Sequence, residues 1–100
     1  MTEEQLSGKQ KRFLRAKGSV IDPVVQIGKG GVGPTVVDSA DSVLAARELI
    51  KVQVLTNCAE EPADVIAELA EATGAQLVQV IGRKGLLFRR NDEKPRISLP

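Results

Sequence analysis

Hydrophobic positions along this chain follow two different periods, and the order of those periods predicts a small α/β fold. Three segments repeat apolar residues at every third or fourth position, as a helix with one buried face does. Short apolar or alternating runs between and after them are typical of strands. The predicted elements are helices between Ser7 and Gly18, from about Pro34 to Arg47 and from Pro62 to Gly74, and strands at 24–27, 49–55, 77–81 and 86–90.

The order helix, then β-α-β-α-β-β, restricts how the strands can pair. Each β-α-β crossover is expected to be right-handed, which predicts two parallel pairings in one sheet. The turn 82–85 between the last two strands is so short that these strands must be antiparallel. Apolar and polar residues alternate in 49–55, which predicts a sheet covered fully on one side only. We therefore expect a two-layer α/β domain with a mixed four-stranded sheet.

Local signals mark where the helices begin and end. Ser7 and Gln10 have the spacing of a capping box, and Gly18 is expected to close the first helix. Pro34 and Pro62 precede the other two helical patterns. Proline is favoured at the first helical position, so both helices are expected to start there.

Length and composition indicate one domain. The chain has 100 residues, of which 42% are hydrophobic, enough for a modest core. We expect the domain to span residues 1–100, with a core at about 6–90 and a tail, 91–100, that is extended or loose. The start is polar and acidic and lacks the apolar core of a signal peptide, and no apolar run approaches membrane-spanning length. These features predict a soluble cytoplasmic protein with no membrane partner. We also expect it to be a monomer.

The net charge of +1 hides a separation of charges along the chain. Residues 8–17 hold five basic residues and no acid, and residues 83–96 hold six basic against two acidic residues. Residues 34–74 hold eight acidic residues against Arg47 and Lys51. If the two basic ends meet in the fold, the surface is dipolar, and a polyanionic partner binds on one side only.

The first helix carries a candidate anion-binding face. Phe13 and Leu14 fall on one side at helical spacing and are expected to pack on the sheet, while Lys11, Arg12 and Arg15 fall on the other side. A solvated helix face usually mixes charges of both signs, whereas this face is positive only.

The residue types exclude most catalytic and metal sites. The chain has no His and one cysteine, Cys58, so it can build neither a Ser-His or Cys-His pair nor a thiolate metal site. The carboxylates Asp64, Glu68 and Glu71 fall on the solvent side of the third helix, which indicates a polar helix face rather than acid–base chemistry. We therefore expect no enzyme, no metal and no cofactor.

A glycine-rich loop, 28–33, links the first strand to the second helix. Glycine amides can approach a phosphate closely, and the helix N-terminus adds unpaired N–H groups. Residues 29–35, KGGVGPT, are one residue from the nucleotide-binding form KGGxGKT, but Pro34 replaces the lysine that reaches the nucleotide phosphates. We therefore expect no bound nucleotide. A loop that merely turns the chain before Pro34 is the remaining alternative.

Four segments of the chain stand out when they are taken together. They are Gly8–Arg15, Pro23–Gly31, Glu48–Val52 and Val78–Arg83. In this order they resemble the CRM domain, and the chain is most similar to its stand-alone bacterial form, the YhbY family of RNA-binding proteins, over residues 6–99. The resemblance implies a fold like the C-terminal domain of bacterial translation initiation factor three. It also implies a GxxG loop that touches RNA, and association with precursors of the large ribosomal subunit.

Two details depart from the family pattern. Phe88 and Arg90 stand where members often have Tyr and then Pro, so a phenolic hydrogen bond is lost and a cation is added. Gly85 stands where a bulkier residue is common, which leaves the turn 82–85 less well defined.

These features together predict an RNA-binding protein that holds the sugar-phosphate backbone of rRNA through loop amides and the basic first helix. The predicted RNA-contacting residues are Lys9, Lys11, Arg12, Arg15, Gly28, Lys29, Gly30, Gly31, Arg83, Lys84 and Arg89. The only aromatic residues, Phe13 and Phe88, are expected in the core, so base stacking contributes little. One alternative is a protein-interaction module whose basic face binds an acidic partner. Another is a KH domain, but its GxxG loop joins two helices, whereas this loop leaves a strand.

Overall fold

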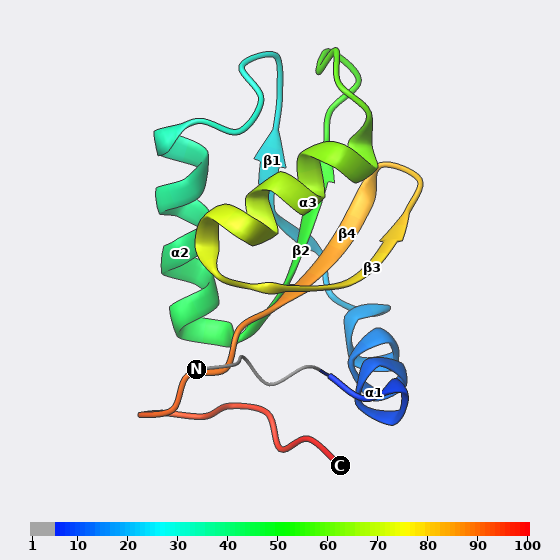
Figure 1. Cartoon of the computed structure of the whole chain (residues 1–100), viewed down its shortest axis with the longest axis vertical. Coiled ribbons are helices and arrows are strands. Elements are labelled where there is room, and N and C mark those ends of the chain that lie inside the picture. Colours follow the sequence, from blue (N-terminus) through cyan, green and yellow to red (C-terminus); the bar gives the residue numbers. More distant parts are fainter. Residues whose placement is uncertain (1–5) are drawn as a thin grey trace.

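Helices pack on both faces of a four-stranded sheet in a computed structural model that describes residues 6–100 (Figure 1). In chain order the elements are α1 (Gly8–Gly18), β1 (Pro23–Ile27), α2 (Pro34–Arg47), β2 (Leu49–Val54), α3 (Pro62–Thr73), β3 (Gln76–Ile81) and β4 (Lys84–Phe88). This order confirms the predicted helix followed by β-α-β-α-β-β. Residues 1–5, on which the expectation of no signal peptide rested and where the predicted domain starts, lie outside the described residues.

The sheet is mixed, as predicted, but only one of the two predicted parallel pairings forms. The order is β1-β2-β4-β3, with β1 parallel to β2 and with β4 antiparallel to both of its neighbours. The prediction of a second parallel pairing is therefore wrong, because β4 lies between β2 and β3. Leu86, Leu87 and Phe88 make β4 apolar on both faces, and such a strand is buried in the middle of a sheet rather than at its edge.

The predicted helix starts are confirmed. Ser7 caps α1 in a complete capping box: its Oγ accepts from the backbone N–H of Gln10 at 3.1 Å, and its own N–H donates to Oε1 of Gln10 at 3.0 Å. The helices α2 and α3 begin at Pro34 and Pro62, and α3 ends at Thr73 with the predicted Gly74 as its left-handed C-cap. The local signals in the sequence therefore set the helix boundaries.

The helix α1 ends at Gly18, as predicted, but Gly18 is not its cap. Ser19, with a helical φ of −65°, caps the end of α1, and Gly18 remains part of the helix. Gly18 is buried against β4, where a Cβ atom would lie 2.5 Å from Cδ1 of Leu86. Glycine at this position therefore allows α1 to approach the sheet closely.

Each face of the sheet has its own hydrophobic cluster. On one face, α2 and α3 cover residues such as Val52 and Leu87. On the other face, Leu14 of α1 packs in a smaller cluster with Leu49 and Phe88, which we call the α1 cluster. One helix cannot cover the whole of this second face, which agrees with the expectation of a sheet covered fully on one side only.

The β3–β4 hairpin is tighter than predicted. Ile81 pairs with Lys84, so the connecting turn consists of residues 82–83 rather than 82–85. Gly85 is a strand residue, and a Cβ atom there would lie 2.7 Å from a side-chain carbon of Ile66 in α3. A bulkier residue at this position would therefore push α3 away from β4.

The segment 91–100, expected to be extended or loose, forms no helix or strand but is held to the domain by Glu48. This residue alone connects α2 to β2, with a φ of 67°, and its side chain is fully buried. Its carboxylate accepts three hydrogen bonds. The donors are the backbone N–H groups of Asn91, Arg96 and Ile97, at 2.6, 2.7 and 2.8 Å. Ile97 and Leu99 then pack against the α1 cluster.

The surroundings of Glu48 also change its protonation. Burial raises the pKa of the Glu48 carboxyl, but the three N–H donors and the charge of Arg90 outweigh burial and hold the pKa below its ordinary value of 4.5. Because the pKa is lower in the folded protein than in the unfolded chain, this stabilisation is complete above pH 4.5. It is lost as the pH falls through the lower pKa of the folded state.

We expect Glu48→Gln to lower the free energy of unfolding by about 2 kcal/mol, because the amide nitrogen cannot accept a hydrogen bond and the charge of the acceptor is lost. In a domain of this size the melting temperature falls by about 10 °C. Urea unfolding from neutral to acid pH should show the difference between the two proteins shrinking below pH 4.5, as the wild-type carboxyl is protonated.

Glu93→Gln is the matched control, since Glu93 is an exposed carboxylate in the same segment. It should leave the stability unchanged. If the Glu48→Gln protein were as stable as the wild type at neutral pH, the carboxylate would not be what anchors residues 91–100.

Candidate nucleic-acid interface

The β1–α2 loop makes a sharp turn at the end of β1. The backbone N–H of Gly31 donates to the carbonyl of Gly28 at 3.0 Å, which closes a turn with Lys29 and Gly30 at its tip. These two tip residues are exposed, and Gly33 follows as the N-cap of α2. The loop therefore offers backbone amides and one cation to solvent beside the N-terminus of a helix.

The glycines of this turn are not equivalent. A Cβ atom at Gly30 would have no neighbour within 4 Å. Gly31 has a φ of 67°, and a Cβ atom there would lie 3.2 Å from Oε2 of Glu60 in the β2–α3 loop. The turn itself therefore requires glycine at position 31, whereas position 30 is open.

The basic residues of α1 surround the side of the helix that packs on the sheet. Leu14 is buried beneath the helix, whereas Lys9 and Arg12 are exposed. Lys11 and Arg15, one turn apart, are half-buried at the margins of the packed side. Among the described residues, none of these four cations forms an ion pair. Their charges are therefore available to an external anion.

Arg83 and Lys84, in the β3–β4 hairpin, differ in how their side chains are engaged within the protein. The guanidinium of Arg83 donates from Nε to the carbonyl of Val54 at 2.9 Å and from Nη2 to the carbonyl of Leu55 at 2.6 Å. It therefore caps the end of β2 as well as adding charge there. Lys84 is exposed on the same side of the sheet as Leu86 and α1, because alternate strand residues share a face.

Arg89 lies on the other side of the sheet. Its guanidinium forms an ion pair with Asp41 of α2 and donates to the carbonyl of Thr73, at the C-terminal end of α3, at 2.8 Å. A carboxylate and helix C-terminal carbonyls both stabilise a cation. The structure therefore does not bring Arg89 together with the other predicted contact residues, and we leave it out of the surface proposed below.

The loop and α1 lie toward opposite ends of the longest axis of the molecule, which extends 37 Å (Figure 1). The uncovered part of the sheet face lies between them. Cross-strand partners there form two rows, one nearer the loop and one beside α1. The first row is Gln53, Lys84 and Ile81, the second is Lys51, Leu86 and Gln79, and we call these six residues the sheet-face patch.

Lys51 is absent from the predicted contact residues, although the sequence contains its signal. It occupies a polar position between the buried residues Ile50 and Val52, so it must point to the opposite face from theirs. What the sequence does not reveal is that this face is the one that carries α1.

Other chemistry is limited in the part of the chain that the structure describes. No group of Cys, Asp and Glu side chains there is arranged to hold a metal ion, and Cys58 is buried and unpaired. None of the described helices combines the length and the apolar character needed to cross a membrane.

Fold and site together define a small α/β domain with a polarised surface: basic α1 lies on one face of the sheet, and α3, with its exposed carboxylates, lies on the other. The chain belongs to the CRS1 / YhbY (CRM) domain family, whose model matches residues 6–89. The resemblance noted in the sequence is therefore confirmed.

Similar proteins occur in bacteria and archaea. The chain is 46% identical to the probable RNA-binding protein YqeI of Bacillus subtilis, over 95% of this chain and 99% of that one. It is 43% identical to the probable RNA-binding protein MJ0652 of Methanocaldococcus jannaschii, over 89% of this chain and 69% of that one. The solution structure of SAV1595 from Staphylococcus aureus, 45% identical, superimposes with a TM-score of 0.80 and covers 96% of this chain and 100% of that one. This likeness confirms the α/β fold.

The unequal glycines of the loop predict unequal stability effects. We expect Gly31→Ala to lower the free energy of unfolding by about 1 to 2 kcal/mol, because an L side chain is strained at positive φ. Gly30→Ala should be neutral or slightly stabilising, since the site is open and alanine restricts the unfolded chain. Urea unfolding of both proteins checks this, and equal losses would show that the turn is formed differently.

Proposed function

We propose that this protein binds structured RNA in the cytoplasm, as a monomer, during assembly of the large ribosomal subunit. The observation that carries the proposal is the unpaired positive charge of α1 on one face of the sheet, opposite the acidic α3. Relatives that are 46% and 36% identical over nearly the whole chain are named as RNA-binding proteins, which supports RNA as the polyanion. The family resemblance supports rRNA of large-subunit precursors as the particular RNA.

The proposed RNA contacts lie at two ends of one surface, on α1 and on the β1–α2 loop. At one end, Lys9, Lys11, Arg12 and Arg15 of α1 bind neighbouring phosphates. At the other end, the amides of the β1–α2 loop and the ammonium of Lys29 hold a second stretch of backbone, as a glycine-rich turn allows. Contacts of these kinds fix the position of the RNA but do not read its sequence.

The acidic side of the molecule restricts the side from which RNA can bind. Asp64, Glu68 and Glu71 are exposed on α3, across the sheet from α1. These carboxylates repel phosphates, so the RNA approaches from the α1 side only. In the loop, Pro34 lacks both the ammonium and the N–H that a nucleotide would need, and we propose no nucleotide as ligand.

Charge reversal on α1 tests the main contact. If about six phosphates are contacted, the wild-type log K falls against log salt with a slope of roughly −4 to −5. We expect Lys11→Glu, Arg12→Glu and Arg15→Glu together to abolish measurable RNA binding at physiological salt, because three phosphate contacts become repulsive. The fold should survive, since none of the three is fully buried and Leu14 keeps α1 packed. Fluorescence anisotropy with a structured rRNA fragment and circular dichroism measure the two effects.

Reversal of Lys94 and Arg96, which are exposed in the C-terminal segment, is the control and should weaken binding far less. Sedimentation of a tagged protein through a ribosome gradient tests the partner: the wild type should travel with large-subunit precursors and the triple variant should not. A folded triple variant that still co-sediments would overturn the proposal. So would a wild type that binds an acidic peptide as tightly as it binds RNA.

The loop contact has its own test. We expect Gly30→Asp to weaken RNA binding about tenfold with no change in melting temperature, because a carboxylate at the exposed tip repels phosphate and meets no atom within 4 Å. Ala67→Asp, which adds the same charge at an exposed position of α3, should leave the affinity nearly unchanged. Equal affinities of the wild type and Gly30→Asp would reduce the loop to a turn between β1 and α2.

A further inference from the structure

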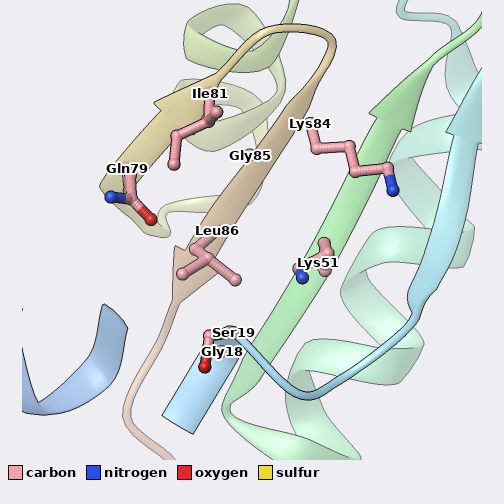
Figure 2. Close-up of a pocket in the computed structure, with 8 residues that line it drawn as sticks. All are labelled: Gly18, Ser19, Lys51, Gln79, Ile81, Lys84, Gly85 and Leu86. Carbon is pink, nitrogen blue, oxygen red and sulfur yellow. The ribbon is translucent and has the colours of Figure 1, made fainter. Parts of the chain in front are cut away.

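The sheet-face patch lines a pocket that the RNA-backbone contacts proposed above do not use. Figure 2 shows Gln79 and Ile81 of β3 on one side of Leu86, and Lys51 and Lys84 on the other. Gly18 and Ser19, at the end of α1, close one end of the pocket. Its volume is about 270 Å³, just below the lower end, about 300 Å³, of the range for pockets that hold drug-sized ligands. A group of about the size of one nucleobase therefore fits this space.

The pocket combines an apolar floor with two cations at one side. Leu86, only 3% exposed, forms the floor. None of the eight described residues that line the pocket is acidic, and neither Lys51 nor Lys84 forms an ion pair among the described residues. The charge of this site therefore complements an anion that carries an apolar, flat group, which is the chemistry of a nucleotide in RNA.

The wall on β3 supplies groups that contact a base. Ile81 is 66% exposed, an unusual state for an isoleucine, and it stands next to Lys84 in the first row of the patch. The amide of Gln79 has a donor and an acceptor and, among the described residues, forms no side-chain hydrogen bond. Apolar surface for the face of a base and an unused amide for its edge thus lie on one strand, two residues apart.

We infer that the sheet-face patch binds one unpaired nucleotide of the RNA, with its base against Ile81 and Gln79 and its flanking phosphates at Lys51 and Lys84. The inference rests on the proposed function and adds a preference for RNA with an exposed base. A base inside a helix offers no free face, and the major groove of an RNA duplex is too narrow for side chains to enter. The patch lies between α1 and the loop. The RNA backbone on one side of the extruded base therefore reaches α1, and the backbone on the other side reaches the loop.

Two RNA hairpins of equal stem length, both closed by a non-nucleotide linker so that neither has loop bases, test the inference: one stem is fully paired and the other has a single bulged nucleotide. At the same ionic strength, we expect the wild type to bind the bulged hairpin about tenfold more tightly, the value of one base contact of about 1.4 kcal/mol. Gln79→Ala and Ile81→Ser should each remove most of this preference and leave the affinity for the paired hairpin unchanged. Fluorescence anisotropy measures all the affinities, and thermal melting confirms that the variants are folded.

Leu77→Ser is the matched control for Ile81→Ser. Leu77 is also an exposed apolar residue of β3, at 36%, but it pairs with Leu87 and so faces the α3 side of the sheet. Its replacement should leave the preference for the bulge intact.

The outcomes separate this inference from the proposed function. Variants that keep the tenfold preference, or a wild type that binds both hairpins equally, overturn the nucleotide site and leave RNA binding through α1 and the loop in place. A wild type that binds neither hairpin overturns both. If Ile81→Ser weakens binding of a fluorescent oligoglutamate peptide rather than of the bulged RNA, the patch is a peptide site and the inference fails.

Discussion

The buried carboxylate of Glu48 is the interaction on which the positions of the C-terminal segment and of α1 depend. A single residue joins α2 to β2, so the backbone must reverse within it, and the positive φ that results costs about 1 to 3 kcal/mol in a residue other than glycine. Glycine would avoid this cost but would leave three N–H groups of the C-terminal segment without an acceptor. Because the carboxylate accepts all three, the segment is drawn across the end of the sheet and its apolar residues complete the α1 cluster.

The same contact reaches the candidate binding surface through α1. The side-chain amide of Gln10 donates to the carbonyl of Pro100 at 3.3 Å, so α1 touches the segment that Glu48 holds. On its other side α1 is set by Gly18 against Leu86. These two contacts, like the packing of Leu14 in the α1 cluster, involve none of the unpaired cations of the helix. Its charges are therefore left for an external partner.

The elements were predictable from the sequence because their signals are local. Capping residues and apolar periodicity act within a few positions, and they placed the helix starts correctly. Strand order is not a local property. It depends on β4, which is apolar on both faces and therefore lies between β2 and β3. The position of Arg89, away from the other predicted contact residues, has a related cause, since charge alone grouped it with Lys84. Lys84, Leu86 and Phe88 share one face, so the residue after Phe88 faces the other, and the true start of the strand was needed to see this.

The role of Glu48 had no sequence signal at all, because its donors are backbone groups more than forty residues away. The family resemblance supplied the loop and the class of ligand, and the likeness to the C-terminal domain of translation initiation factor three stays a prediction. The sheet-face patch became visible only when cross-strand register placed Lys51 beside Leu86 and Gln79, residues that lie on three different strands.

The separation between the β1–α2 loop and α1 limits how the proposed RNA-binding surface can act. Charges in solution are screened over about 8 to 10 Å at physiological salt, whereas the loop and α1 lie toward opposite ends of a 37 Å axis. The charges of the loop and of α1 are therefore screened from each other, and they do not form one continuous electrostatic field. Glu60 beside Gly31 and the carboxylates of α3 further restrict the loop to an approach from the α1 side. An RNA that touches both ends must therefore lie along the uncovered sheet face, where amides and two lysines replace the dense positive charge of α1. In the proposed binding mode, α1 and the loop therefore hold the RNA backbone, and the sheet-face patch between them contacts one unpaired base.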